Sequence, residues 1–365
     1  MRIVTSISWF LFRILAVYSF AVIILIYFAL SDHWIAGFMM MSFPIIIILN
    51  FLFLLVFLLF DKKRVLFPAG ILLISLVFLP RTYGTNGVSE VVKNKEQKTF
   101  RLLNYNVHQF FFNSDEKQDK ESEGKWIRAM RGWVINSEAD ILCMPEYRSA
   151  HDYPEMNINR ELRKNGYNYF SFMNSSQNSS QNYEGLAIFS KYPIIETEEK
   201  YFGSLNGMLR ADIKIKADTI RVIAVHLYSM TLELSKFVEQ RKADGVKKEG
   251  KIVIGRIKSG FVGHAEEYPE LEAWIKSSPY PVIVCGDFNE TPYGYVYGKT
   301  RDLLTNAFEE KGRGFGFTYN HLPYFIRIDH QFYDAKKLNL LHFETIDSVK
   351  YSDHYPLIGT YQVKR

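Results

Sequence analysis

Two features that readily classify a chain are scarce in this sequence. It has only two cysteines, and its formal net charge of +5 is too small to argue for nucleic-acid binding by itself. Each cysteine lies in a short apolar run, Ile141–Met144 or Val282–Cys285, as is typical of buried thiols that pack as small hydrophobes. The cysteines therefore favour neither a disulfide nor a catalytic thiol, and they do not fix the redox compartment.

Charge is missing from one long part of the chain. No charged residue occurs between Trp34 and Phe60, whereas from Lys93 onward the sequence is typical of a water-soluble protein. The 365 residues suffice for one large domain of roughly 250 residues and a smaller part. We therefore predict a transmembrane anchor over residues 1–80, a linker over 81–98 and a catalytic domain over 99–365.

Three apolar stretches open the chain, at Trp9–Leu30, Trp34–Phe60 and Val65–Leu79. The first is interrupted only by Arg13 and the second is uncharged, while the third is short and contains Pro68. A cleaved signal peptide has one apolar core followed by a small-residue cleavage site, which three successive stretches do not match. The pattern predicts an integral, multi-pass anchor of about three helices that is retained.

The short loops between these stretches predict an orientation. Asp61–Arg64 carries three positive charges, whereas Ser31–His33 has no Lys or Arg. The positive-inside rule then places the Asp61–Arg64 loop in the cytoplasm and everything after the third span on the non-cytoplasmic side. If the third stretch only lies on the membrane, the catalytic domain moves to the cytoplasmic side.

From Thr99 onward, short apolar runs typical of strands alternate with polar and helical segments. Helices are expected over about 124–137 and 266–276. Strands and helices mix without strict βαβ alternation, which favours a packed α/β sandwich over a doubly wound parallel sheet.

Polar residues suited to a hard cation or a phosphate recur at the ends of the apolar runs. They are Asn106, Glu146, His226, Asp287 with Asn289, Asp329, and the late pair Asp353 and His354. Singly, each has an ordinary interpretation as a turn residue, a helix cap or a buried histidine. Together they are carboxylates and amides without cysteine, a set that suits Mg²⁺ or Mn²⁺ better than structural zinc.

In order and composition, these motifs resemble the endonuclease/exonuclease/phosphatase superfamily of metal-dependent phosphoesterases. Gly-Asp-Phe-Asn at 286–289, followed by Ser-Asp-His at 352–354, is the most specific part. The resemblance covers about Thr99 to the C-terminus, and the apolar stretches make the chain similar to a membrane-anchored, bacterial-type member. The other segments that carry it are Leu103–Val107, Asp140–Glu146, Glu184–Pro193, Val225–Leu227, Arg327–Asp329 and Tyr355–Pro356.

The resemblance implies a four-layer α-β-β-α sandwich, with two sheets face to face and helices outside. It implies that Glu146 is the main metal ligand, with Asn106 beside it and Asp353 sharing the metal shell. Asp287 would orient or deprotonate the attacking water, and Asn289 would hold that water or a phosphate oxygen. The remaining roles fall to His226 and His354 as phosphate contacts and to Asp329 as the residue that orients His354.

One position departs from the family pattern. The exonuclease III-like members usually have an Asp two residues after the first-motif Asn, where this chain has His108. A second acidic ligand is therefore missing, which argues against DNA-repair activity.

Three functions stay open at this stage. The leading one is divalent-metal-dependent hydrolysis of a phosphoester at the membrane surface, with a lipid head group or nucleic acid as the substrate. The second is a membrane-tethered nuclease that acts on DNA, and the third is a catalytically silent binding module. The basic segment Lys236–Lys258 is a clamp for a polyanionic substrate, a contact for anionic head groups near the membrane or, as its composition favours, a solvated loop and helix face. No protein partner is deducible.

Overall fold

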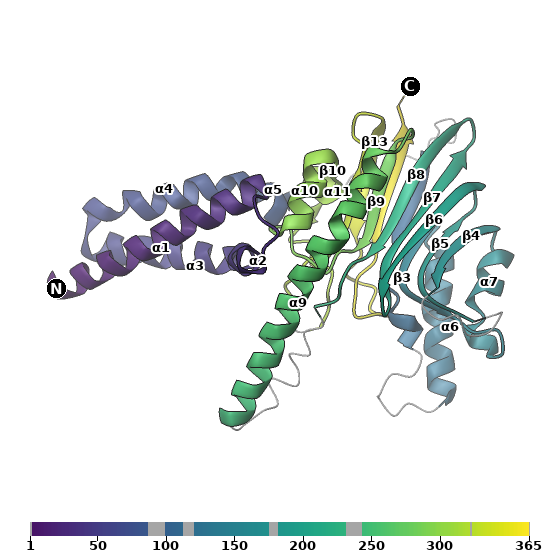
Figure 1. Ribbon diagram of the computed structural model, residues 1–365, viewed down its shortest axis with the longest axis horizontal. Coiled ribbons are helices and arrows are strands. Elements are labelled where there is room, and N and C mark those ends of the chain that lie inside the picture. The colour runs from purple at the N-terminus through teal and green to yellow at the C-terminus, as the bar shows by residue number, and fades with distance from the viewer. Residues whose placement is uncertain are drawn as a thin grey trace.

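The computed structural model describes residues 2–86, 99–111, 120–174, 182–230, 243–321 and 323–364. A bundle of apolar helices precedes a sandwich of two β-sheets, and Figure 1 shows the bundle projecting from one side of the sandwich. The bundle consists of α1 (Arg2–Phe28), α2 (Trp34–Met41), α3 (Phe43–Phe60), η1 (Lys62–Arg64), α4 (Leu66–Ser75), η2 (Leu76–Phe78) and α5 (Leu79–Thr82).

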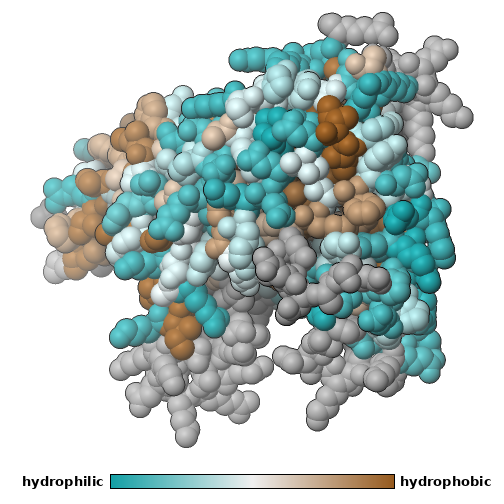
Figure 2. Space-filling view, turned by 45° about the vertical axis from the view of Figure 1, so that its right-hand side comes forward, coloured by the Kyte–Doolittle hydropathy of each residue, from teal (hydrophilic) through white to brown (hydrophobic). Residues whose placement is uncertain are grey.

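Three helical segments of the bundle are long and apolar enough to cross a membrane. They are Ser6–Phe28, Phe43–Phe60 and Lys62–Thr82. Figure 2 shows the consequence at the surface, where hydrophobic residues gather at the left-hand end of the molecule and the sandwich at the right is mostly hydrophilic. Pro68 does not interrupt the third segment because it lies in the first turn of α4, where its missing N–H needs no partner.

The composition of the apolar stretch Trp34–Phe60 suggested a single span, but the stretch does not form one helix. It breaks at Ser42 into α2 and α3, and α3 begins with Pro44 in its first turn. Proline has no N–H to donate to the preceding turn, so the helix that begins at Trp34 cannot continue through it. Within this stretch, only Phe43–Phe60 is a candidate span. The short helix α2 packs against another helix of the chain, as described below.

The sandwich has the predicted four layers. The first sheet has the strand order β10 (Thr305–Asn306), β12 (Asp329–Tyr333), β9 (Val282–Asp287), β8 (Asp218–His226), β7 (Asn206–Ile215), β6 (Ile194–Gly203). The second sheet has the order β13 (Leu338–Thr345), β14 (Leu357–Val363), β2 (Thr99–Asn104), β3 (Ile141–Ser149), β5 (Tyr183–Ser190), β4 (Tyr169–Asn174). Within each sheet, the pairs β8–β9 and β2–β3 are parallel.

Helices cover the outer faces of both sheets. One apolar core lies between the sheets, a second lies under α6 (Lys120–Asn136) and α7 (Ile158–Lys164), and a third lies under α9 (Ala243–Lys276) and α10 (Tyr295–Leu303). Both cysteines are buried in the central core, as the sequence predicted. Short elements complete the fold: α11 (Ala307–Lys311), β1 (Gly84–Thr85), β11 (Arg313–Gly314), η3 (His108–Phe111) and η4 (Pro154–Met156).

The bundle and the sandwich are joined by packed side chains. The ring of Tyr293, from the loop after β9, lies 4.8 Å from the ring of Phe43, and its hydroxyl shares a 2.9 Å hydrogen bond with Thr82. The first residues of the expected linker belong to this joint, since β1 pairs with β11 and Arg81 donates to the carbonyl of Pro292. Residues 87–98, the rest of that linker, lie outside the described residues.

Candidate active site

The strand register brings the polar strand ends to one rim of the sandwich. In the first sheet Asp287 is the partner of His226 on one side and of Asp329 on the other. In the second sheet Asn106 follows β2, and Glu146 lies within β3 just beyond the part of that strand that pairs with β2. Because the two sheets are packed face to face, these groups converge at the same edge of the central core.

A backbone irregularity directs Glu146 toward this rim. The pairing of β3 with β5 shifts register between Met144 and Tyr147, and Glu146 has a positive φ of 51°. Such bulges re-aim a side chain and are common beside active sites. The Asn106 amide nitrogen donates to Glu146 Oε1 at 2.9 Å and to Asp287 Oδ2 at 3.1 Å. One fully buried amide therefore holds a carboxylate from each sheet.

The Gly-Asp-Phe-Asn motif forms a tight turn at the end of β9. Gly286 has φ 145°, and a Cβ at that position would lie 2.0 Å from the carbonyl oxygen of Val225, so a larger residue does not fit. Asn289, with φ 49°, donates its backbone N–H to Asp287 Oδ1 at 2.8 Å. Its side-chain nitrogen donates to the Leu227 carbonyl at 3.0 Å, which ties this turn to the segment after His226.

His226 presents one unsatisfied nitrogen to the carboxylates. Its Nδ1 lies 2.9 Å from the carbonyl oxygen of Leu205, which only accepts, so Nδ1 carries a proton and donates it. Its buried Nε2 has no hydrogen-bond partner among the described residues. That nitrogen lies 3.7 Å from Glu146 Oε1 and 3.8 Å from Asp287 Oδ2.

His354 is held by Asp329 on the other side of Asp287. Its Nδ1 lies 2.7 Å from Asp329 Oδ2, and its Nε2 lies 3.8 Å from Asp287 Oδ2. Burial alone would lower the pKa of His354, but the negative charges of Asp329 and Asp287 raise it well above its ordinary value. Burial, and then the charge of Asp329, raises the pKa of Asp287 to about 6. The pair therefore combines a cationic donor with a carboxyl group that titrates near neutral pH.

Asp353 lies beside this cluster and pairs with His108. Asp353 Oδ1 is 2.9 Å from His108 Nδ1 and accepts from the Ser352 hydroxyl at 3.1 Å. Burial alone would raise the pKa of Asp353, but the hydrogen bond from His108 and the charge of His354 hold it well below its usual range. His108, which stands where the exonuclease III-like members were expected to have an Asp, thus contributes a basic group that neutralises a carboxylate.

Two neighbouring residues were not identified from the sequence. Thr318 accepts through Oγ1 from the backbone N–H of Asp329 at 3.1 Å, and the ring of Tyr319 lies 5.2 Å from that of His354. Burial, and then the charge of Asp353, raises the pKa of Tyr319, so its hydroxyl remains a donor. The segment that contains them is rich in glycine and aromatic residues and has no carboxylate, so no pattern in the sequence indicated a role for them.

The residues present fit a divalent cation. Among the described residues, two groups of ligand atoms lie close enough together to hold a metal ion: Glu146, His226 and Asp287, and Asp287, Asp329 and His354. The first group combines two carboxylates with the buried Nε2 of His226, which has no hydrogen-bond partner among the described residues. A cation bound between these three ligand atoms would give each of them a partner. Asp353, expected to share the metal shell, belongs to neither group.

The four-layer fold and the acidic and histidine side chains at its rim are the features that assign this chain to a family. A model of the endonuclease/exonuclease/phosphatase family matches residues 103–354, and the chain belongs to that family. A second model, of a domain of unknown function, matches residues 3–82. A search of curated proteins gave no match.

Solved structures share the fold at low sequence identity. The human Nocturnin catalytic domain with bound sulfate is 16% identical with a TM-score of 0.51, covering 73% of this chain and 96% of that one. ANGEL2, a 2′,3′-cyclic phosphatase, is 18% identical with a TM-score of 0.50, covering 76% and 100%. An endonuclease/exonuclease/phosphatase from Beutenbergia cavernae is 13% identical with a TM-score of 0.50, covering 73% and 72%.

Proposed function

We propose that this chain hydrolyses a phosphoester at a membrane surface with the help of a divalent cation, Mg²⁺ or Mn²⁺. The observation that carries the proposal is the convergence of Glu146, His226 and Asp287 at one rim, with a buried nitrogen that has no partner among the described residues. A cation bound there supplies positive charge to the non-bridging oxygens and the leaving group.

The chain's own groups have separable roles in this proposal. Glu146 is the main ligand, and Asn106 holds its carboxylate in place through the 2.9 Å hydrogen bond. Asp287 accepts the proton of the attacking water, which its pKa of about 6 allows near neutral pH. Asn289 positions that water or a phosphate oxygen.

The two histidines have different roles in this proposal. His354, kept protonated by Asp329, donates from Nε2 to a phosphate oxygen and balances the charge that develops there. His226, expected from the sequence to contact the phosphate, instead offers its Nε2 to the cation together with Glu146 and Asp287. Asp353, paired with His108, belongs to neither group of candidate metal ligands, and its role in this proposal is to balance the charges of His108 and His354.

The placement at a membrane rests on the joint between the bundle and the sandwich. We propose that residues 1–80 span the membrane and that the sandwich lies on its non-cytoplasmic side, opposite the Lys62–Arg64 loop. Tyr293, which packs against the bundle, is only four residues beyond Asn289, so the rim is held close to the anchor rather than on a free tether. This proximity favours a lipid head group over DNA as the substrate.

The test is hydrolysis by the whole chain in vesicles or detergent. Phosphate-ester cleavage of phospholipid and of DNA is compared in parallel, with Mg²⁺ and with chelator. Chelator-sensitive cleavage of phospholipid supports the proposal. Cleavage of DNA alone makes the chain a tethered nuclease, and no turnover of either substrate contradicts the proposal.

A further inference from the structure

Helix α9 changes character along its length. Between residues 250 and 263 it contains Lys251, Arg256 and Lys258 and no acidic residue, whereas its last part contains four glutamates. The glutamates are Glu266, Glu267, Glu270 and Glu272. One continuous helix thus has a basic part and an acidic part, and only the acidic part lies over the core of the first sheet.

The basic part of α9 is the part that contacts the anchor. The ring of Phe261 lies 5.5 Å from that of Phe38 on α2, and a Cβ on Gly37 would lie 2.5 Å from the Phe261 ring. The ammonium group of Lys258 lies 4.6 Å from the ring centroid of Trp34, at the start of α2. Because α2 joins the ends of two candidate spans, this part of α9 lies at the end of the bundle that faces the sandwich (Figure 1).

A stripe of this same part is apolar, exposed and interrupted by a lysine. Ile254, Lys258 and Val262 follow one another at helical spacing, and 58% of Ile254 and 41% of Val262 are exposed. Tryptophan and lysine with exposed aliphatic residues beside a span are typical of the interface between lipid head groups and acyl chains. Exposing these aliphatic side chains to water is unfavourable, whereas burying them among acyl chains is favourable.

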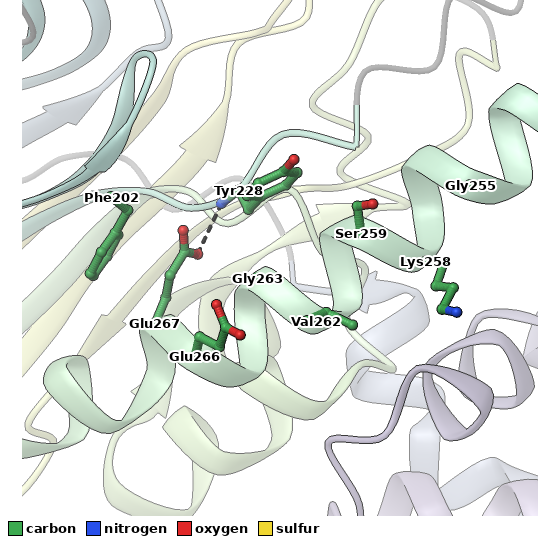
Figure 3. Close-up of a pocket in the computed structure, with 9 residues that line it drawn as sticks. All are labelled: Phe202, Tyr228, Gly255, Lys258, Ser259, Val262, Gly263, Glu266 and Glu267. Carbon is green, nitrogen blue, oxygen red and sulfur yellow. Dashed lines mark hydrogen bonds between the residues drawn. The ribbon is translucent and has the colours of Figure 1, made fainter.

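A groove lies between this stripe and the segment that follows His226. It encloses about 560 Å³ and is lined by Lys258, Ser259 and Val262 of α9 and by Phe202 and Tyr228 across from them. Figure 3 shows Lys258 on the side of the anchor and Glu267 bonded to the backbone N–H of Tyr228 at the other end. Tyr228 follows His226 by two residues in the chain, and His226 itself does not line the groove.

We propose that residues 250–263 of α9 lie on the bilayer surface beside the anchor and bind anionic phospholipid there. The inference rests on the membrane placement in the proposed function and adds a lipid class to it. The three basic residues supply the attraction to negative head groups, and Ile254 and Val262 enter the boundary with the acyl chains. Residues 236–242 of the basic segment recognised in the sequence lie outside the described residues, so the surface is defined by 250–263 alone.

The experiment measures the depth of single cysteine labels in the whole chain. Both native cysteines are buried, so an added exposed cysteine is the site that reacts. Ile254→Cys probes the surface, Ala273→Cys probes an exposed position on the acidic part of the same helix, and Val17→Cys probes α1, where 73% of the native side chain is exposed. Each variant carries an environment-sensitive fluorophore in phosphatidylcholine vesicles, with or without phosphatidylglycerol, and a lipid-borne quencher.

The expected result is several-fold stronger quenching at 254 than at 273, increasing with phosphatidylglycerol. Lys251→Glu with Lys258→Glu should abolish that increase and leave quenching at 17 unchanged. A label at 254 as exposed to water as the label at 273, with position 17 quenched, overturns this inference alone. An unquenched label at 17 overturns the membrane placement on which both proposals rest, and quenching at 254 that ignores phosphatidylglycerol overturns the choice of anionic lipid.

Discussion

The anchor and the sandwich expose opposite kinds of residue. In the anchor, large apolar side chains point outward, with 77% of Leu59 and 78% of Leu66 exposed, while Ser19 and Asn50 are buried and hydrogen-bonded to each other at 3.0 Å. The sandwich buries its apolar residues and exposes most of its charges, and a cluster of buried ionisable groups lies at one rim. There Asp287, Asp329 and His354 are buried together.

This difference indicates which variants should affect stability and which should affect catalysis. Buried ionisable groups are costly to desolvate, so a protein that could put these groups in water would gain stability by doing so. The rim keeps them because each has a charged or hydrogen-bonding neighbour, as in the pair of Asp329 with His354. In the anchor, by contrast, the buried pair of Ser19 and Asn50 is uncharged, and its two members hydrogen-bond to each other. We therefore expect rim variants to change catalysis and anchor variants to change stability.

The largest effect is expected at Asp287. Asp287→Asn keeps the size of the side chain and removes the proton acceptor, so the rate of phosphoester hydrolysis should fall by about 10²–10⁴-fold. Glu199→Gln, an exposed change on β6, is the matched control and should leave the rate unchanged. Both variants should still unfold cooperatively, which shows that they fold, and a wild-type rate in Asp287→Asn would refute the assignment.

The next effect is a pH dependence of stability at Glu267. This side chain is 3% exposed, and burial raises its pKa from 4.5 to about 8. The folded chain therefore binds this proton more tightly than the unfolded chain, so the stabilisation is present below about pH 4.5 and lost as the pH rises toward 8.

In Glu267→Gln this contribution is removed. Between pH 5 and pH 8 the wild type should lose roughly 3 kcal/mol more of its free energy of unfolding than the variant, at about 1.4 kcal/mol per pKa unit. Denaturant unfolding of the whole chain in detergent at several pH values measures the difference. Glu266→Gln, an exposed neighbour, is the control, and parallel curves for wild type and Glu267→Gln would contradict the prediction.

The joint between the two regions comes next. Tyr293→Ala removes a ring that packs on Phe43 and a hydrogen bond to Thr82, and should cost about 3 kcal/mol. Tyr293→Phe keeps the ring and should cost about 1 kcal/mol. Unfolding of the whole chain measures both, and equal costs would show that the ring does not hold the joint.

The smallest effect is expected inside the anchor. Ser19→Ala removes the hydroxyl that accepts from Asn50, and hydrogen bonds between membrane helices are worth only about 0.6 kcal/mol on average. Detergent-induced unfolding should shift slightly, and hydrolysis should not change. A loss of activity would mean that packing inside the anchor affects the arrangement of the active-site rim.

Much of this architecture was predictable from the sequence, for a definite reason. The parallel pairs β2–β3 and β8–β9 end at the same rim, so polar residues placed after each apolar run had to meet. The spacing of Asn106, Glu146 and Asp287 therefore predicted a cluster. The family match confirmed the resemblance, and the fold confirmed the four layers.

Other features depend on contacts that no local pattern encodes. His108, Gln109 and Phe110 have successive positive φ values of 41°, 51° and 58°, a turn that propensities do not favour for such residues. That turn accompanies the pairing of His108 with Asp353. Tyr319 reaches the rim from a segment without metal-ligating carboxylates, and the packing of α2 on α9 joins residues far apart in the chain.

The most direct test of the central claim is cation binding by the whole chain, measured by titration with Mn²⁺ and electron paramagnetic resonance of the free ion. Wild-type protein should bind Mn²⁺ in competition with Mg²⁺, and Glu146→Ala should lose that binding while Glu199→Gln keeps it. Equal Mn²⁺ binding by wild type and Glu146→Ala, or none by wild type, would contradict a metal-dependent site at this rim.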